Sequence, residues 1–438
     1  MVISQGAFAV MIFTDRYFMS LISPTHMAAS LGGGVTSFFC MSLFLGILSY
    51  SNALVAQYYG SGERAKCPRV LSQGIFLLLA FIPLLLAMGY LVSDIFILME
   101  HVPAQAELEK QYFLILIWGA GFALAKTCIA SYFAGIGQTR VVMIADTLGV
   151  LLNVPLSYVL IFGIWKFPEM GIAGAAWGTI ISTFFSLLIF LAFYLEPIHV
   201  ARFSVKKSFR LDRGILHRYL RLGVPSGIEM FLNVAAFNLF LLMFQSYGIA
   251  EAASAAIVFN WDLISFIPMI GLNVAIISLI GRFIGAGNLH KMSEVIRAGF
   301  LIGLGYSSLL ALTFWIWREP LVAIFLEPGS TNTAIQSLSG FMMMGLATYV
   351  MADAIILVAG GVLRGAGDTR WLMWTSVLIH WFMLVVQYFV IKVWTMGPRA
   401  SWVVMVLMVL ATGFTYLWRL SSNRWRTPEA FARVMAEH

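Results

Sequence analysis

The chain has 438 residues, of which 61% are hydrophobic and only 11% are charged, and its mean hydropathy is +0.89. Soluble proteins carry about 25% charged residues on average, so this composition excludes an ordinary soluble protein and predicts insertion into a lipid bilayer. The formal charge of +7 is small for the length and its bases fall in short loops, which argues against a nucleic-acid-binding surface. The three cysteines are far apart and predict neither a disulfide framework nor a metal site.

Twelve segments are long and apolar enough to cross a bilayer, since a spanning helix needs roughly 20 apolar residues. We expect them at 2–22, 34–56, 70–93, 111–134, 141–164, 172–194, 219–246, 252–280, 295–317, 335–361, 371–394 and 400–420. Glycine and polar residues typical of turns separate most of them. The predicted fold class is therefore an all-α integral membrane protein with twelve transmembrane helices.

An internal repeat divides the chain into two halves. VAQYYGSGERAK (55–66) resembles IGRFIGAGNLHK (280–291), and GIGQTR (135–140) matches GAGDTR (365–370). Six spans separate the two copies, so both halves have the same orientation and are expected to be related by pseudo-two-fold symmetry about the membrane normal. Pro225 lies near the start of the seventh span, and the equivalent position in the first half would fall just before Met1. The first span is therefore expected to be shorter at its start than the seventh.

We therefore expect an N-terminal six-helix half at 1–195, a basic linker at 196–218, a C-terminal six-helix half at 219–420 and a tail at 421–438. Twenty of the 27 Lys and Arg residues lie in or beside the loops after even-numbered spans and in the tail, whereas five lie in the loops after odd-numbered spans. The positive-inside rule then places both termini, the linker and the tail in the cytoplasm. The predicted location is the cytoplasmic (inner) membrane, with the chain a multi-pass monomer.

Seven Asp, Glu, Lys and Arg residues lie inside the predicted spans and away from their end turns: Asp15, Arg16, Lys126, Asp146, Glu229, Asp262 and Asp353. A charge at the bilayer centre costs about 2.5–3.5 kcal/mol on insertion scales, so such residues are expected to face a shared interior and to mark an ion pathway. A buried acid can carry a proton inward while a cationic substrate leaves. Alternatively, carboxylate, hydroxyl and carbonyl oxygens can hold a sodium ion, a hard cation that prefers oxygen ligands.

In the second half, Asp353 is the strongest candidate for binding the coupling cation. Tyr349 lies four residues before it, on the same helical face. Glu229 and Asn233 are likewise four residues apart and are predicted to share the cation-coupling role, while Asp262 is expected in the same cluster as a substrate- or proton-binding residue. The alternative for Asp353 and Glu229 is structural pairing or hydrogen bonding between helices.

In the first half, Asp15 is predicted to bind substrate or a proton, with the alternative that it forms a structural ion pair with Lys126. Asn153 and Lys126 are predicted to share this substrate- or proton-binding role. Asn153 precedes Pro155, where a kink would free a backbone carbonyl for a side chain or an ion. Lys126 is expected to pair with Asp15 or with Asp146, or else to act as a coupling base. Pairing is the favoured interpretation.

Together these features resemble the multidrug and toxic compound extrusion (MATE) transporters. The resemblance rests on the order and doubling of the motifs: VAQYYGSGER after the second span, IGRFIGAGN after the eighth, and the two GxGxTR loops. It implies cation-coupled efflux, driven by sodium or protons, through a V-shaped cavity between the halves. It also implies that Asp15 is the first-half coupling acid and that Asp353 with Tyr349 is the second-half cation site.

Two positions depart from the family pattern. Asn233 stands where many members carry a glutamate eight residues after the proline, and Glu229 lies four residues after it. Arg16 beside Asp15 is also unusual.

The predicted function is a cation-coupled antiporter that exports hydrophobic, cationic drugs or metabolites by alternating access, without a cofactor other than the coupling Na⁺ or H⁺. The alternative is a flippase for lipid-linked oligosaccharides from the related superfamily. A flippase would favour a basic cavity, but acids outnumber bases within the spans. The seven histidines are scattered and no nucleophile–base pair stands out, so an enzyme is not expected.

Overall fold

The computed structural model describes residues 2–98, 103–325, 333–422, 424–427, 429 and 431. Within these residues every regular element is helical. The long helices are α1 (Val2–Ile22), α2 (Pro24–Ser49), α3 (Ser51–Gly60), α4 (Cys67–Val92), α6 (Pro103–Gly135), α7 (Thr139–Phe162), α8 (Ile172–Tyr194), α10 (Arg213–Gln245), α11 (Ile249–Gly285), α12 (Leu289–Ile316), α14 (Thr333–Gly365), α15 (Thr369–Tyr388) and α16 (Pro398–Ser421). The short ones are α5 (Ile95–Leu98), α9 (Pro197–Phe203), η1 (Val205–Lys207), α13 (Arg318–Ala323), the π-helix η2 (Phe389–Val393) and η3 (Arg424–Arg426).

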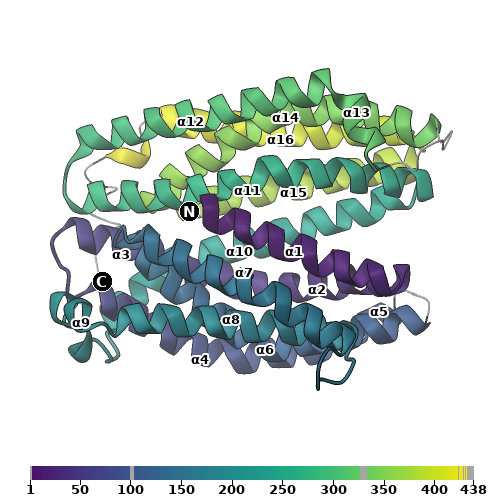
Figure 1. The fold of residues 1–438 in the computed structure, drawn as a ribbon. Coiled ribbons are helices and arrows are strands. Elements are labelled where there is room, and N and C mark those ends of the chain that lie inside the picture. The colour runs from purple at the N-terminus through teal and green to yellow at the C-terminus, as the bar shows by residue number, and fades with distance from the viewer. Residues whose placement is uncertain are drawn as a thin grey trace.

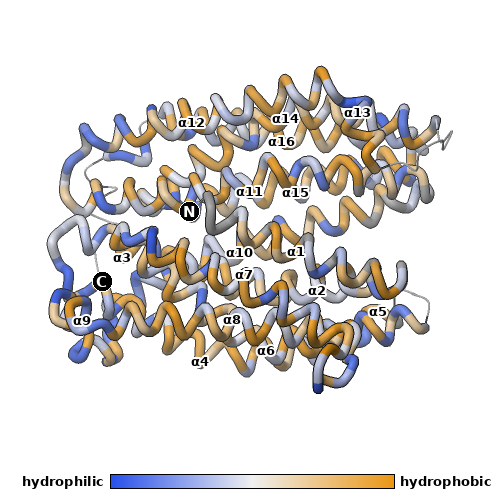
Figure 2. Tube along the Cα trace, viewed as in Figure 1, coloured by the Kyte–Doolittle hydropathy of each residue, from blue (hydrophilic) through white to orange (hydrophobic). Residues whose placement is uncertain are grey.

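Apolar membrane-spanning helices dominate the molecule, as the sequence predicts. Eleven helical stretches in the described part of the chain are long and apolar enough to cross a bilayer. The 21-residue helix α1 coincides with the first predicted span and completes the set of twelve. Figure 2 shows apolar residues along the length of the bundle and hydrophilic residues concentrated near its two ends. The prediction of an all-α integral membrane protein with twelve transmembrane helices is confirmed.

The helices form two packed groups, visible as the lower purple-to-teal and upper green-to-yellow groups in Figure 1. One set of buried apolar clusters uses residues up to Leu222, and the other uses residues from Ala236 onward. Helices α1 and α10 join the groups, because α1 packs against α7 and α11 while α10 packs against α2 and α15. Each half therefore has its own core.

Several helices extend beyond the predicted apolar segments. Helix α2 begins at Pro24, ten residues before the predicted span, where the Ser23 hydroxyl accepts a hydrogen bond from the backbone N–H of His26 and Pro24 occupies the first turn. Helix α10 begins at Arg213, inside the predicted linker, which also holds α9. Hydropathy detects only the part of a helix inside hydrocarbon, so polar end turns are missed.

At one end of the bundle the halves are tightly closed. A methyl group at Gly60 would clash with the backbone carbonyl of Arg282, and one at Gly285 would clash with that of Gln57, so α3 and α11 cross in backbone contact. Four side chains donate hydrogen bonds across the boundary to backbone carbonyls: Tyr50 to Arg364 (3.1 Å), Asn52 to Val274 (3.1 Å), Gln57 to Gly365 (2.9 Å) and Ser278 to Ala134 (2.7 Å).

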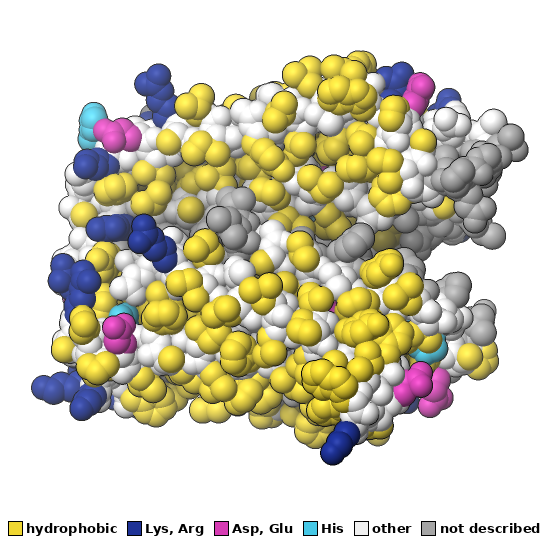
Figure 3. Space-filling model, in the orientation of Figure 1, with side chains coloured by type: hydrophobic (Ala, Val, Ile, Leu, Met, Phe, Trp, Pro, Cys, Tyr) yellow, Lys and Arg dark blue, Asp and Glu magenta, His cyan; other side chains and the backbone are white. Residues whose placement is uncertain are grey.

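This closed end also carries α9 and the loops at 61–66 and 286–288, and we call it the basic end. Figure 3 shows Lys and Arg side chains gathered there, and it shows the surface hollowed between the two halves at the opposite end, which carries α5 and α13. The structure is therefore closed at the basic end and opens toward the other.

Candidate functional site

Two acids and a tyrosine come together in the second half. Asp353 and Tyr349 lie on α14, the most enclosed of the described spans, and Asp262 lies on α11, which packs against it. The charges of Asp262 and Asp353 are near enough to interact, and both lie close to Tyr349. The Tyr349 hydroxyl is buried and has no hydrogen-bond partner among the described residues. This second-half cluster can bind a cation, because two carboxylates held together are stabilised by one.

A proline inside α11 frees a backbone carbonyl in the same region. Pro268 lies six residues after Asp262, and a proline inside a helix leaves the carbonyl four residues earlier, here that of Ile264, without its helical partner. Tyr306 on α12 donates to that carbonyl at 2.8 Å. The Ser265 hydroxyl lies 3.1 Å from Asp262 Oδ1 and 2.7 Å from the Asp262 carbonyl oxygen. The turn that carries Asp262 is thus supported by hydroxyl groups from its own helix and its neighbour.

The first half holds a separate polar cluster around Asp15. The Thr179 hydroxyl on α8 lies 3.2 Å from Asp15 Oδ2 and 3.1 Å from the Ala175 carbonyl oxygen of its own helix, so its one proton serves either acceptor. Asn153 and Ser157 on α7 lie beside the same carboxylate. Asn153 Nδ2 lies 3.4 Å from Ser182 Oγ. Asp15 is 8% exposed, and Asn153 and Ser157 are fully buried.

This first-half cluster (Asp15, Asn153, Ser157 and Thr179) has unused binding capacity. Asp15 Oδ1, Asn153 Oδ1 and Ser157 Oγ are all buried without a well-formed hydrogen bond among the described residues, although Asn153 and Ser157 lie within reach of the Asp15 carboxylate. Buried polar atoms normally have partners, so three unsatisfied oxygens in one place point to a group that binds there. Their chemistry, a carboxylate with amide and hydroxyl oxygens, suits a small hard cation or a proton.

A glycine allows α7 and α8 to pack closely at this cluster. A methyl group at Gly178 would clash with the Ser157 hydroxyl oxygen, so only glycine permits α8 to approach α7 this closely. The same approach brings Thr179, the next residue, against Asp15. Thr179 and Ser157 are not among the residues predicted from the sequence, although Ser157 follows Asn153 by four residues and shares its helical face.

The in-span lysine does not belong to the first-half cluster. Lys126 Nζ lies 3.0 Å from Asp146 Oδ1, joining α6 to α7. Of the two expected partners, Asp146 is therefore the one that the structure supports, and the proposed pair between Lys126 and Asp15 is not formed. The side chain of Arg16 lies outside the described residues.

Glu229 is placed differently from the prediction. Its carboxylate accepts a hydrogen bond from Arg364 Nη2 at 2.6 Å, and the Tyr416 hydroxyl lies 3.4 Å from the same oxygen. Arg364 was expected in a loop, but α14 continues through it to Gly365, so its side chain reaches the bundle interior. The expectation that Asp262 clusters with Glu229 is wrong, because Asp262 adjoins Asp353 instead.

Asn233 lies one turn beyond Glu229 on α10 and faces α15. Asn233 Nδ2 donates to Ser376 Oγ at 2.7 Å, while Asn233 Oδ1 is buried without a described partner. The four residues predicted for cation coupling therefore fall in two places. Asp353 and Tyr349 belong to the second-half cluster, and Glu229 and Asn233 belong to a network with Arg364, Tyr416 and Ser376.

Comparison with solved structures identifies the class of fold. The eukaryotic MATE transporter AtDTX14 matches with a TM-score of 0.86 at 16% identity over 96% of its chain and 99% of this one. A MOP superfamily transporter from Pyrococcus furiosus matches with a TM-score of 0.85 at 18% identity, covering 94% of its chain and 96% of this one. An outward-facing multidrug resistance MATE family transporter matches with a TM-score of 0.81 at 18% identity and the same coverage. The fold is that of MATE transporters.

The sequence family agrees with the fold. The MatE family model matches residues 1–159 and 225–389, which together are more than half of the chain. The protein belongs to the MatE family of membrane transporters. The resemblance drawn from the doubled glycine motifs is thereby confirmed.

Proposed function

We propose that the protein is a cation-coupled antiporter that exports hydrophobic organic cations by alternating access. It would act as a monomer in the cytoplasmic (inner) membrane, with both termini and the basic end in the cytoplasm. The observation that carries the proposal is the presence of one carboxylate cluster inside each half: the buried Asp15 with Asn153, Ser157 and Thr179, and the half-buried Asp353 and Asp262 with Tyr349.

Each cluster would exchange a coupling Na⁺ or H⁺ for cationic cargo. A carboxylate in a low-dielectric interior is stabilised by a bound cation, whether that cation is a sodium ion, a proton or an organic substrate. Competition for the same negative charge then makes binding of the ion and binding of the cargo mutually exclusive. That competition is what an antiporter requires, since the ion must enter by the route through which the cargo leaves.

The conformation fits one step of such a cycle. The hollow between the halves at the end opposite the basic loops would release cargo to the outside, while the crossing of α3 and α11 seals the cytoplasmic side. The units that rock would be the halves 1–195 and 219–420, joined by the linker 196–218. Glu229 and Lys126, paired with Arg364 and Asp146, would stabilise these units rather than bind the ion.

The ion pairs of Lys126 with Asp146 and of Arg364 with Glu229 argue against the flippase alternative. Binding the pyrophosphate of a lipid-linked sugar calls for unpaired cations inside the cavity. In the described residues, Lys126 and Arg364 each contact a carboxylate at 3.0 Å or less. The buried Arg218 lies at the closed end, where it donates to Gln57 Oε1 and lies over the Tyr58 ring, away from the hollow between the halves.

Ethidium transport in membrane vesicles, with sodium and proton gradients imposed separately, tests the proposal. We expect one of the two gradients to drive ethidium against its concentration gradient, and Asp15→Asn and Asp353→Asn to abolish that movement at normal protein levels. Ethidium movement that responds to neither gradient would contradict cation coupling.

A further inference from the structure

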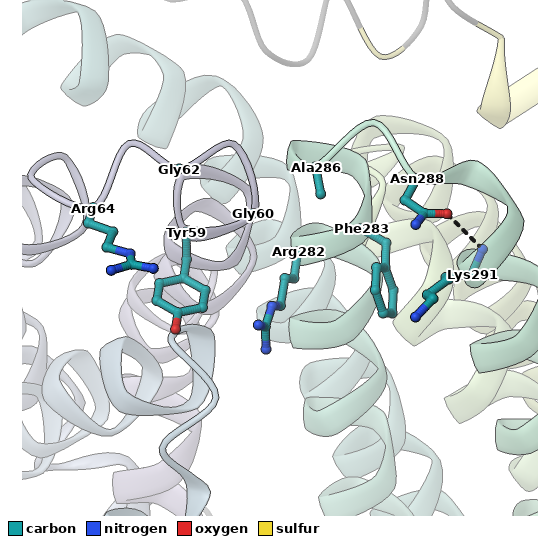
Figure 4. A pocket seen from close by; sticks show the side chains of 9 residues that line it. All are labelled: Tyr59, Gly60, Gly62, Arg64, Arg282, Phe283, Ala286, Asn288 and Lys291. Atoms are coloured by element: carbon teal, nitrogen blue, oxygen red, sulfur yellow. Dashed lines mark hydrogen bonds between the residues drawn. The ribbon is translucent and has the colours of Figure 1, made fainter.

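A pocket of about 360 Å³ lies at the basic end, between the loop that follows α3 and the loop that follows α11 (Figure 4). Both halves build it. Tyr59 and Arg64 come from the first half, and Arg282, Asn288 and Lys291 come from the second. We call it the interhalf pocket. It plays no part in the proposed ion pathway, which runs through the carboxylate clusters inside the bundle.

Cations converge on this pocket from separate segments. Figure 4 shows Arg64 and Arg282 on opposite sides of the Tyr59 ring, and their guanidinium carbons lie 5.9 and 4.9 Å from its centroid. Arg202 from α9 also lies 3.5 Å from the Tyr59 hydroxyl through its Nη2 atom. Lys291 adds a further positive charge.

No carboxylate offsets these charges within the pocket. Its lining holds no Asp or Glu, and within the described residues Arg64, Arg282 and Lys291 have no carboxylate within 4.0 Å. Like charges held together repel unless an anion lies between them. Neighbouring bases on the same face do form ion pairs. Lys66 lies 2.7 Å from Glu63, and Arg69 lies 3.7 Å from Asp212. The convergence therefore distinguishes the pocket from an ordinary basic surface.

The repeated glycine motifs explain how the pocket forms. GSGERAK and GAGNLHK occupy equivalent places in the two halves, and Gly62 and Gly287 adopt positive φ angles of 82° and 67° that turn each chain sharply into the next helix. Asn288 Oδ1 accepts a hydrogen bond from the backbone N–H of Lys291 at 3.3 Å, which fixes the start of α12 at the pocket. The positive end of that helix adds to the field of the side chains.

The cations of the pocket lie at the ends of candidate membrane spans, where lipid headgroups are expected. Arg64 begins the span Arg64–Val92, Arg282 lies three residues before the end of Ala253–Gly285, and Lys291 is the second residue of His290–Ile316. Basic residues at span ends on the cytoplasmic side attract anionic lipid, at about 1 kcal/mol per residue. A lipid phosphate at this depth could enter the pocket without leaving the membrane surface.

We propose that the interhalf pocket binds a phosphate-bearing anion, and that this anion bridges the two halves while the basic end is closed. Guanidinium groups bind phosphate oxygens through paired hydrogen bonds, and Lys291 supplies an additional charge. The phosphate comes from an anionic lipid headgroup of the adjacent leaflet or from a soluble phosphate. The anion stabilises the closed arrangement because its ligands come from both halves.

The test measures thermal unfolding of the full chain in neutral detergent at constant ionic strength. The added compounds are phosphatidylglycerol, inorganic phosphate and, as a zwitterionic control, phosphatidylcholine. We expect phosphatidylglycerol or phosphate to raise the unfolding midpoint by about 2–4 °C in a saturable manner. Phosphatidylglycerol alone identifies a lipid site, and phosphate alone identifies a soluble ligand.

The decisive comparison is between two triple variants of equal charge. Arg64→Gln/Arg282→Gln/Lys291→Gln should lose the stabilisation, whereas Arg140→Gln/Arg370→Gln/Lys206→Gln, which removes exposed cations outside the pocket, should keep it. If the first triple variant does not fold, the single variant Lys291→Gln, which changes an exposed side chain, is used instead. It should bind the anion more weakly than the wild type does. Equal stabilisation in pocket and control variants, or no stabilisation of the wild type by either anion, would overturn the proposal. Because the readout is binding, it is independent of whether ethidium transport is ion-coupled.

Discussion

Arg364 Nη2 lies 2.6 Å from Glu229 Oε1, so a base near the end of α14 neutralises a buried acid on α10. The Glu229 residue is only 2% exposed, and Tyr416 on α16 approaches the same carboxylate oxygen at 3.4 Å. This contact joins three helices of the second half. It also means that the Glu229 charge already has a partner in this conformation, whereas no Lys or Arg among the described residues pairs with Asp262 or Asp353.

We predict that Glu229→Gln destabilises the protein more than the double change Glu229→Gln/Arg364→Gln. The single variant leaves the Arg364 cation without its acid, a loss of about 3 kcal/mol for a largely buried pair, whereas the double variant removes both charges. Thermal unfolding in detergent measures the difference. A single variant as stable as the wild type would show that the pair contributes nothing.

We predict that Thr179→Val lowers ion-driven ethidium transport by about tenfold, because a hydrogen bond to a charged group contributes about 1.5–3 kcal/mol and this one orients Asp15. Valine keeps the shape of threonine but cannot donate. Thr313→Val is the matched control, since the Thr313 hydroxyl bonds only to its own helix, at the Leu309 carbonyl. Equal transport by the two variants would remove Thr179 from the site.

We predict that Gly285→Ala opens the basic end. The added methyl group would occupy the space of the Gln57 carbonyl. Overpacking of this kind costs about 1–3 kcal/mol, enough to lower the ratio of closed to open molecules about tenfold. Ser278→Cys, buried beneath the crossing, should then react faster with a maleimide from the basic side. The described native cysteines are all buried, which keeps the background low.

The control for this experiment is Gly305→Ala, because nothing lies within 4 Å of a methyl group there. Maleimide reaction that is unchanged in Gly285→Ala, or equally fast in Gly305→Ala, would contradict the role assigned to the glycine crossing.

We predict that stability falls as the pH drops from about 6.5 toward 4 because of His199. This residue, on α9 outside the spans, is 5% exposed and lies 2.9 Å from the Tyr132 hydroxyl through Nε2. Burial, aided by the nearby Arg202 charge, lowers the pKa of His199 from 6.5 to about 4. The unfolded chain therefore binds the proton first, which costs about 2–3 kcal/mol of stability by pH 4.5.

The pH dependence is measured by chemical or thermal unfolding of wild type, His199→Gln and His217→Gln. Removing His199 should flatten the dependence between pH 6.5 and 4, while removing the exposed His217 should leave it as in the wild type. An unchanged slope in His199→Gln would assign the effect to other groups.

The sequence predicted the spans and the repeat well, because hydropathy and doubled glycine motifs are local properties of the chain. It did not predict which charged residues form ion pairs. Lys126 and Asp146 are 20 residues apart and Glu229 and Arg364 are 135 apart, so their pairing depends on how helices rotate and pack. Arg364 was treated as a loop base because apolar residues end there, although the helix does not.

Hydroxyl residues of the site were the least predictable. Thr179 and Ser157 resemble many other threonines and serines in the spans, most of which bond to their own helix, as Thr179 also does at the Ala175 carbonyl. What distinguishes them is the close approach of α7 and α8 at Gly178, which no spacing within one helix reveals. Asp353 and Tyr349 could be paired in advance because they are four residues apart on one helix.

The central claim is that carboxylates inside the two halves exchange a small cation for cargo. The most direct measurement adds ethidium to the detergent-solubilised protein and records released protons with a pH indicator and released sodium with a selective electrode. We predict that the wild type releases one of these ions in proportion to the ethidium bound, and that Asp15→Asn/Asp353→Asn releases none. Saturable ethidium binding to the wild type without release of either ion would contradict the account.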